Sequence, residues 1–284
     1  MNSQTKQGFT TKNFSSDLFG PPRGPTVSEV TRPLFSKTVG ILFLSAMLGL
    51  SIVLPEAQAT GFKIRVTEFT DPTLTTVVTP ATVVTDNDVG DLSGTLGFIN
   101  STFTTTHFDI IATYGTSKPL GGNSPSFNRI DLFNVDVINT GGGGTLLVEI
   151  TDIDFSNAAM DALGGTFTTS IGGTLGWLPN TLMVESFWDS SNASFGTGTL
   201  ISSLGTFSGP GSFSDDEVVY TAPLAGLNGP FSMTQKLTIT MVGPDVISYD
   251  SDLYAQPVPE PGTMLLLGSG LLGLIGYRRK FCQP

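Results

Sequence analysis

The stretch Phe231-Ser-Met-Thr-Gln-Lys-Leu-Thr-Ile-Thr-Met-Val242 alternates apolar and polar side chains over its second half. Successive side chains of an extended strand point to opposite faces, so Leu237, Ile239 and Met241 lie on one face and the intervening threonines on the other. A strand with one buried and one solvated side has this pattern. The stretch therefore predicts an antiparallel sheet with one face packed on a core.

Similar runs, rich in β-branched and aromatic residues, recur through the middle of the chain between clusters of Gly, Pro, Asn and Asp. They favour one all-β domain over residues 60–255, a single antiparallel β-sandwich that is jelly-roll-like. A β-helix is the alternative, but no repeat of fixed period supports it. Only residues 157–163 look helical. The expected strands are residues 62–66, 75–79 and 81–85 around Pro80, 102–114, 130–138, 146–150, 181–188, 217–220 and 231–242.

Three finer expectations concern the connections. The glycine-rich turn at residues 141–144 separates two runs and predicts a hairpin between residues 130–138 and 146–150. The first of these runs departs from strict alternation near Phe133, which predicts a β-bulge. After residue 242 the sequence predicts a short link to the C-terminal segment.

Charge and cysteine content exclude several functions. The chain of 284 residues has a net charge of −11, and residues 60–260 hold 5 Lys and Arg against 21 Asp and Glu, a net charge of −16. Such acidity argues against nucleic acid as a partner, because binding requires basic side chains that neutralise phosphates. A single cysteine, Cys282, cannot form an internal disulfide. A single histidine, His107, excludes a His-rich metal centre.

The N-terminus has the features of an export signal. A basic flank precedes an uncharged apolar run over residues 38–54, which Pro55 interrupts. Ala57 and Ala59 then place small residues at the two positions that signal peptidase reads. We therefore predict that residues 1–59 are an N-terminal extension and signal peptide. The alternatives are a retained membrane anchor and a later translation start, which would shorten the long polar stretch before the apolar run.

The C-terminus combines three elements in order. Val258-Pro259-Glu260-Pro261 is followed by a glycine-rich apolar segment, residues 262–277, and then by the basic cluster Arg278-Arg279-Lys280. These elements indicate an extended proline stretch, a transmembrane helix and a basic cytoplasmic stop. A span of about 16 residues with several glycines is short for a permanent membrane helix, which favours a transient anchor.

These three elements resemble the PEP-CTERM sorting signal of Gram-negative bacteria, also known as the ice-binding-protein C-terminal domain, over residues 256–284. The resemblance implies that exosortase recognises and processes the chain at Pro259-Glu260-Pro261. It further implies export across the inner membrane, a transient membrane anchor, and delivery to the cell surface or extracellular matrix. Processing would also remove Cys282 and leave the mature domain without cysteine.

One acidic cluster invites a metal hypothesis. Asp86, Asp88 and Asp91 place three carboxylates and a glycine within six residues, and carboxylate oxygens are the ligands that Ca²⁺ prefers. The terminal Glu and fuller spacing of an EF-hand are missing, so the cluster predicts at most a weak calcium site, with solvated turns as the alternative. No other cofactor is indicated. Further acidic groups are Asp152 with Asp154, Asp215 with Asp216 and Glu217, and Asp250 with Asp252.

No catalytic residue stands out. His107 lies two residues before Asp109, and in a strand both would point to the same face, but no activated nucleophile accompanies them. The paired acids of a glycoside hydrolase cannot be chosen among so many carboxylates. Trp177 and Trp188 are able to stack on sugar rings, although lone tryptophans commonly pack in a core.

We therefore expect a non-enzymatic exported surface or extracellular-matrix protein, an exosortase substrate associated with exopolysaccharide or biofilm. The alternative is a secreted carbohydrate-binding module or glycoside hydrolase on the same fold. Threonine-rich runs at residues 73–85 and 102–106 suit solvent-facing strands, and they would also suit O-linked glycans or an ice-binding surface.

Overall fold

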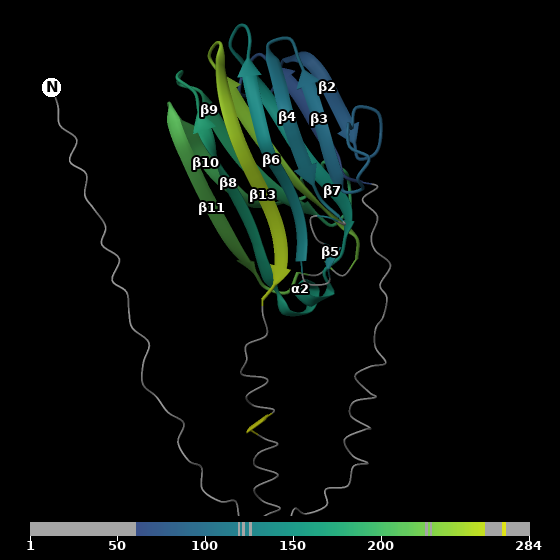
Figure 1. The fold of residues 1–284 in the computed structure, drawn as a ribbon. Coiled ribbons are helices and arrows are strands. Elements are labelled where there is room, and N and C mark those ends of the chain that lie inside the picture. The colour runs from purple at the N-terminus through teal and green to yellow at the C-terminus, as the bar shows by residue number, and fades with distance from the viewer. Residues whose placement is uncertain are drawn as a thin grey trace, which may run out of the picture. The chain divides into compact units, whose positions relative to one another are not determined.

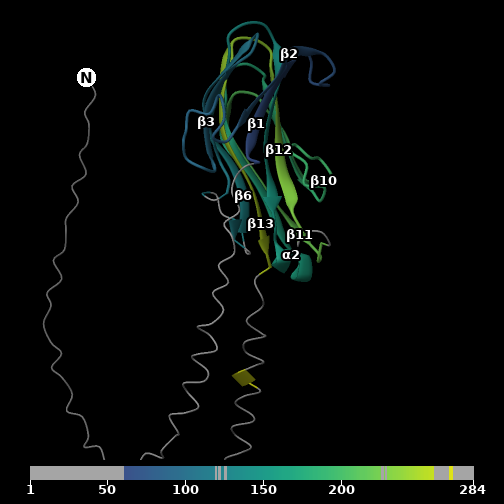
Figure 2. The same cartoon turned by 90° about the vertical axis from the view of Figure 1, so that its right-hand side faces the viewer.

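The computed structural model describes residues 61–258, except 119, 121–122, 125–126, 225–226 and 228, together with residues 269–270. The described chain forms two antiparallel sheets packed face to face, as Figure 1 shows and as the edge view of Figure 2 makes plain. The strands are β1 (Lys63–Phe69), β2 (Val77–Thr85), β3 (Phe98–Thr104), β4 (Phe108–Thr116), β5 (Asn123–Ser124), β6 (Phe127–Asn139), β7 (Gly144–Phe155), β8 (Gly165–Leu175), β9 (Thr181–Asp189), β10 (Thr199–Ser208), β11 (Gly211–Thr221), β12 (Phe231–Met241) and β13 (Asp245–Pro257), with the short helix α2 (Ala158–Leu163) between β7 and β8.

The strand order identifies the sandwich as a jelly roll. Sheet A has the order β10-β9-β12-β7-β1-β2, and sheet B has the order β11-β8-β13-β6-β4-β3 with β5 beside β6. Within them β6 pairs with β13, β7 with β12, β8 with β11 and β9 with β10. One long antiparallel ribbon is thus folded so that its segments alternate between the sheets, which is the double Greek-key arrangement. The predicted all-β, jelly-roll-like sandwich is confirmed.

The core lies between the two sheets and follows the alternation of the sequence. Leu237, Ile239 and Met241 in β12 are fully buried, whereas Thr238 and Thr240 between them are half-exposed. Each fully buried aliphatic side chain contributes about 1.5–3 kcal/mol through removal of its apolar surface from water. The helix predicted at residues 157–163 is α2, and the Asn157 side chain caps it by accepting from the Met160 N–H at 3.1 Å.

The predicted β-bulge near Phe133 is also confirmed. Phe133 and Asn134 in β6 together face Asp250 in β13, so β6 carries one extra residue there. Asn134 has a φ of 56°, a left-handed conformation that asparagine tolerates better than most residues. Its backbone N–H donates a 2.5 Å hydrogen bond to Asp250 Oδ1. The bulge therefore fixes the position of this carboxylate on the face of sheet B.

The predicted hairpin between β6 and β7 is wrong, because the two strands lie in different sheets. The glycine-rich turn carries the chain from sheet B across to sheet A. A Cβ at Gly143 would lie 3.2 Å from the carbonyl oxygens of Met241 and Val242, so glycine allows a close crossing beside the end of β12. Glycines signal the reversal of the chain but not the sheet in which it continues.

Two other expectations about the strands need correction. The run expected at residues 102–114 is two strands, β3 and β4, which a turn at residues 105–107 separates. The segment expected to be a short link is β13, which lies between β6 and β8 near the centre of sheet B. The serines and aspartates on the outer face of β13 have low strand propensity, which hid it in the sequence.

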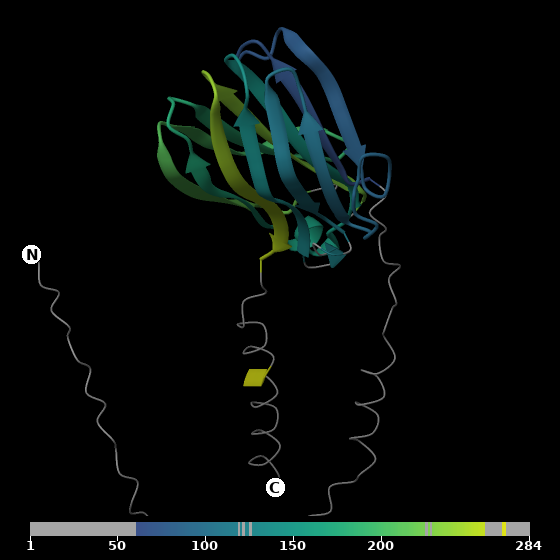
Figure 3. The ribbon, with the colours of Figure 1, turned by 45° about the horizontal axis from the view of Figure 1, so that its top comes forward.

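Different strand ends and turns lie at the two ends of the sandwich. Lys63 at the start of β1 pairs with Thr151, in the last part of β7, and β7 leads into α2. Pro257 at the end of β13 pairs with Gly165 at the start of β8, which follows α2. The start of β1, the end of β13 and α2 therefore lie at one end, which is the lower end in Figures 1 and 3. The β8–β9 and β12–β13 turns lie at the opposite end.

Candidate functional site

The outer face of sheet A carries a row of side chains with alternating charge. Glu185 in β9 and Glu149 in β7 both pair with Lys236 in β12, and Glu149 also pairs with Arg65 in β1. Arg65 Nε lies 2.5 Å from Glu149 Oε2. Opposite charges on neighbouring strands stabilise a sheet, so the charges of this row balance one another across the strands.

The β9–β10 loop lies against the same face of sheet A. The centre of the Phe195 ring lies 4.0 Å from Arg65 Cζ. The backbone N–H of Phe195 donates to Thr151 Oγ1 at 3.1 Å. Lys63 Nζ donates to Ser194 Oγ at 3.4 Å. Arg65 and Lys63 on this face therefore have partners within the chain itself.

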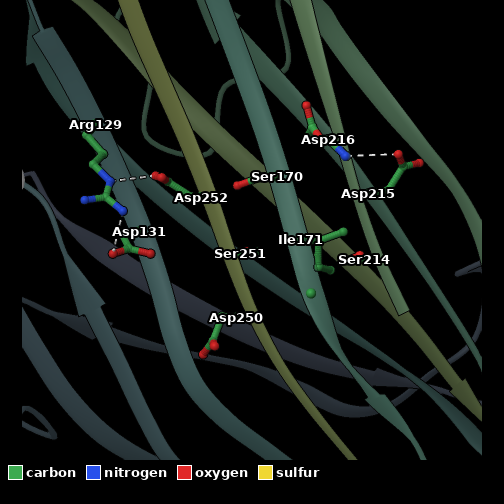
Figure 4. Close-up of a pocket in the computed structure, with 11 residues that line it drawn as sticks. Arg129, Asp131, Ser170, Ile171, Ser214, Asp215, Asp216, Asp250, Ser251 and Asp252 are labelled. Carbon is green, nitrogen blue, oxygen red and sulfur yellow. Dashed lines mark hydrogen bonds and ion pairs between the residues drawn. The ribbon is translucent and has the colours of Figure 1, made fainter. Parts of the chain in front are cut away.

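The outer face of sheet B has a groove instead. Asp216 in β11 and Asp252 in β13 both pair with Ser170 in β8, and Asp252 also pairs with Asp131 in β6. Asp252 and Asp131 thus stand side by side on neighbouring strands, and Ser170 lies between Asp252 and Asp216. The groove has a volume of about 530 Å³, and Figure 4 shows the side chains that line it. They are Arg129, Asp131, Ser170, Ile171, Gly172, Ser214, Asp215, Asp216, Asp250, Ser251 and Asp252.

One arginine bridges two of these carboxylates. Arg129 Nη2 lies 3.2 Å from Asp131 Oδ2, and Arg129 Nε donates to Asp252 Oδ1 at 2.8 Å, as the dashed lines of Figure 4 show. Arg129 is the one basic side chain among the described residues that line the groove. Asp250, Asp215 and Asp216 therefore have no cationic partner in the lining.

The protonation of the groove reflects this excess of carboxylates. Burial raises the pKa of Asp131 to about 6; Arg129 opposes this rise, and the nearby Asp252 and Asp250 carboxylates add to it. Burial also raises the pKa of Asp252, against the hydrogen bond from Arg129. The hydrogen bond to Asp252 raises the pKa of Arg129. The groove thus has a carboxyl group that titrates near neutral pH.

Gly172 in β8 keeps the groove open. A Cβ at Gly172 would meet its nearest neighbours only at 3.8 Å, so the position has room for a side chain that would enter the groove. A smaller hollow of about 280 Å³ continues along β8 and β13, and it shares Gly172 and Asp250 with the first. Together the two hollows make an open track along the strands.

An aromatic ridge, formed by Phe98 in β3, Tyr114 in β4 and Phe133 in β6, lies on the same face. The Phe98 and Tyr114 rings stack with centroids 5.8 Å apart, and the Tyr114 and Phe133 rings with centroids 5.7 Å apart. All three side chains are half-exposed. Because Phe133 lies in the bulge opposite Asp250, the ridge borders the groove. The face therefore presents planar apolar surface beside carboxylates and hydroxyls.

The acids expected to bind calcium accept hydrogen bonds from backbone N–H groups in the β2–β3 loop. Asp86 Oδ2 accepts from the Gly97 N–H at 2.8 Å, and Asp91 Oδ1 accepts from the N–H of Ser93 at 2.9 Å. Asp88 Oδ1 accepts from the Val89 N–H at 2.7 Å. Within the described ranges, no three His, Cys, Asp or Glu side chains are grouped so that they could hold a metal ion. The hydrogen bonds account for the cluster, and calcium binding stays a prediction.

His107 contacts a buried glutamate of the other sheet. His107 lies in the β3–β4 turn, and its Nδ1 is 2.5 Å from Oε1 of Glu68, a fully buried residue of β1. Burial acts to raise the pKa of Glu68, but hydrogen bonds from His107, Thr105 and Thr79 lower it overall. The pair ties the β3–β4 turn of sheet B to β1 of sheet A. It is a structural contact between the sheets, and neither residue lines the groove.

The two tryptophans have different environments. Trp188 is 9% exposed and meets the Phe231 ring edge-on at 6.4 Å, so it belongs to the core. Trp177 is 89% exposed and lies in the β8–β9 turn, at the end of the sandwich opposite α2. Asp245 holds this turn by accepting from the Leu178 N–H at 2.8 Å.

The residues predicted to direct sorting lie mostly outside the described chain. Val258 is described, and its N–H donates to Gly164 O at 3.3 Å. Of the predicted helix at residues 262–277, only Ser269 and Gly270 are described, and both are helical. No helix within the described residues is long and apolar enough to span a membrane. The predicted residues outside the description are Ala57, Ala59, Pro259, Glu260, Pro261, Arg278, Arg279 and Lys280.

Three solved structures that match the chain are distant likenesses. TmCBM61 in complex with beta-1,4-galactotriose is 10% identical and aligns over 60% of this chain and 94% of its own, with a TM-score of 0.27. The enzymatically active domain of tailspike protein 4 of bacteriophage CBA120 is 13% identical over 58% of this chain and 20% of its own, with a TM-score of 0.27. A protein of the infectious bursal disease virus Gx strain is 12% identical over 73% of this chain and 56% of its own, with a TM-score of 0.29. Such scores carry no argument about function.

Comparison by sequence identifies the C-terminal segment. No protein of curated function matches the chain. Residues 257–280 match the family model of the PEP-CTERM protein-sorting motif, which confirms the resemblance of the three C-terminal elements. The match begins at the last residue of β13, where the sandwich ends. The chain therefore carries a PEP-CTERM protein-sorting motif and is an exported protein that is sorted to the cell surface.

Proposed function

We propose that the sandwich is a non-enzymatic surface or matrix domain that binds a strand of extracellular polysaccharide on the outer face of sheet B. The observation that supports this proposal is the groove with its carboxylates beside the aromatic ridge. The apolar faces of sugar rings pack on aromatic side chains, and their hydroxyl groups donate to carboxylates. An open track along β8 and β13 suits an extended chain better than a small enclosed ligand.

Charge narrows the class of polysaccharide. Asp131, Asp216, Asp250 and Asp252 line the groove with Arg129 as their one basic neighbour among the described lining residues. An anionic polysaccharide would be repelled from this face, whereas a neutral or amine-bearing one would not. We therefore expect neutral or amino sugars to be retained and uronic acid polymers to be excluded.

A glycoside hydrolase on the same groove is the second candidate. Its support is Asp131, because a carboxyl group with a pKa of about 6 beside further carboxylates is suited to general acid catalysis. We favour binding without turnover, because Arg129 contacts both Asp131 and Asp252 and so occupies the two most buried acids of the groove. The release of reducing ends, and its loss in an Asp131→Asn variant, would favour the hydrolase.

The binding proposal is tested by filling the groove. Protein exported by its host is applied to immobilised neutral, amine-bearing and uronic acid polysaccharides, and retention is compared with that of two variants. Gly172→Val places a side chain in the groove, where there is room for it, and we expect it to abolish retention. Gly205→Val in β10 of sheet A is the matched control, because a Cβ there meets nothing within 4 Å and the added side chain has room as well. Equal retention of both variants would contradict the proposal.

Processing by exosortase belongs to the same proposal. The family match at residues 257–280 supports it. Deleting Pro259-Glu260-Pro261 is expected to leave the protein in the inner membrane, as measured by cell fractionation and immunodetection. Normal delivery of this variant to the cell surface would contradict the sorting mechanism.

A further inference from the structure

A lysine and an aspartate lie buried side by side between the sheets. Lys118 follows β4 in sheet B, and Asp152 lies in β7 of sheet A. Both side chains are 0% exposed, and Lys118 Nζ lies 3.7 Å from Asp152 Oδ2. Burying two charges together is costly even when they are paired, so an ordinary ion pair brings little stability at such a site. The groove on sheet B does not explain why the chain places them there.

The surroundings hold the two groups in a fixed orientation. Ser117 Oγ donates to Asp152 Oδ2 at 2.6 Å, and the Ile153 N–H donates to Asp152 Oδ1 at 2.8 Å. The Lys118 ammonium donates to the Ile153 carbonyl oxygen. It also lies 4.7 Å from the centre of the Phe155 ring. Both oxygens of the carboxyl group thus accept a hydrogen bond, and the amine is held beside it.

Burial also shifts both groups toward their neutral forms. It lowers the pKa of Lys118, although Asp152 and Asp154 oppose this shift. It raises the pKa of Asp152 to about 6, although Lys118 and Ser117 oppose that shift. A neutral amine has a free lone pair, and a neutral carboxyl group is a better electrophile than a carboxylate.

We propose that Lys118 and Asp152 form an intramolecular amide bond in the folded protein. The Nζ lone pair attacks Asp152 Cγ, the Nζ–Cγ bond forms, and the bond from Cγ to Oδ2 breaks. Oδ2 leaves as water with the carboxyl proton and one proton from the amine, so the step needs no oxidant, metal or cofactor.

The neighbouring groups have defined parts in this condensation. The Ile153 N–H stabilises the charge that develops on Oδ1, the oxygen that stays, in the manner of an oxyanion hole. The Ser117 hydroxyl contacts Oδ2, the oxygen that leaves, and is placed to pass a proton to it. Nζ lies 3.7 Å from Oδ2, which is bonded to Cγ, so the attacking nitrogen is already beside the carboxyl group that it attacks.

The bond would join sheet B to sheet A across the interior near the α2 end. The mature domain has no cysteine, so a disulfide cannot make such a link. A covalent cross-link restricts the unfolded chain and stabilises the fold, as a disulfide does. This role suits a domain exposed outside the cell, and it does not depend on whether the groove binds polysaccharide.

Peptide mass spectrometry of the denatured wild-type protein tests the proposal. We expect the peptides that contain Lys118 and Asp152 to appear as one branched species, lighter than their sum by one water molecule. Lys118→Arg keeps the charge but cannot form the amide, so its peptides should separate and its melting temperature should fall. Ser117→Ala should slow the appearance of the branched species after refolding.

The ion pair of Arg65 and Glu149 on the outer face of sheet A provides the control, since its peptides should always separate. The wild-type measurement decides the matter even if a variant fails to fold. Separate, unmodified peptides containing Lys118 and Asp152 from the folded wild-type protein would overturn the proposal. They would leave the two residues as a buried ion pair.

Discussion

The outer faces of the two sheets place charge across their strands in opposite ways. On sheet A, Glu149 lies between Lys236 and Arg65, so neighbours across the strands have opposite charge. On sheet B, Asp252 and Asp131 face each other directly. Opposite charges on facing positions contribute roughly 0.2–1 kcal/mol per pair, and like charges cost stability. Sheet A is therefore arranged for stability, whereas sheet B gives up stability to gather carboxylates, as proteins do at functional sites.

Removing charge from sheet A is expected to have the largest effect on stability. Glu149→Gln leaves Arg65 and Lys236 without the carboxylate between them, and Glu149 is itself 2% exposed. We expect the free energy of unfolding to fall by about 2 kcal/mol, less than for a fully buried pair because Arg65 is partly solvated. Urea denaturation at neutral pH measures this change. An unchanged denaturation midpoint would show that the alternating row contributes nothing.

Removing charge from sheet B is expected to have the opposite sign. Because folding raises the pKa of Asp131 from its ordinary value to about 6, the folded protein binds a proton more tightly than the unfolded chain. Stability therefore falls as pH rises through the interval from about 4 to about 6. Asp131→Asn should raise the free energy of unfolding by about 1 kcal/mol at pH 8.

The pH dependence is the control for this variant. Below pH 4 Asp131 is protonated in both the folded and the unfolded wild-type protein, so the advantage of Asp131→Asn should disappear. Thermal melts of both proteins between pH 3 and pH 8 give the comparison. Destabilisation of the variant at pH 8 would mean that the contact with Arg129 outweighs the burial of the carboxylate.

The aromatic ridge should matter for binding and little for stability. Tyr114 is half-exposed and stacks between Phe98 and Phe133. Tyr114→Ala should weaken retention on a neutral polysaccharide several-fold, since an aromatic contact is worth about 1 kcal/mol. Phe195→Ala on sheet A should leave retention unchanged. Affinity electrophoresis compares the two, and equal losses would place the binding face elsewhere.

The sequence predicted the fold class better than the connections. Alternating residues in β12 indicated the sandwich, and the irregular pattern near Phe133 indicated the bulge, because both are local signals. The partner of β6 across the glycine turn is set by packing between distant strands, so the expected hairpin was wrong. β13 was missed because Ser248, Asp250 and Asp252 on its outer face resemble a polar loop.

The groove was only partly visible in the sequence. The acidic groups around Asp215 and Asp250 stood out, but nothing indicated that they share one face with Asp131. That juxtaposition depends on the register of β11, β8, β13 and β6, which are far apart in the chain. Likewise, nothing in the sequence indicated that Phe98 and Tyr114 lie beside each other, because this depends on the pairing of β3, β4 and β6.

Hydroxyl-radical footprinting with and without a neutral polysaccharide tests most directly the claim that sheet B is the binding face. The method reports the solvent access of aromatic side chains on both faces in one experiment. We expect Phe98, Tyr114 and Phe133 to become protected, whereas Phe195 on sheet A and the exposed Trp177 at the end of the sandwich stay as reactive as before. Protection of Trp177 or Phe195, with the aromatic ridge unchanged, would contradict the claim.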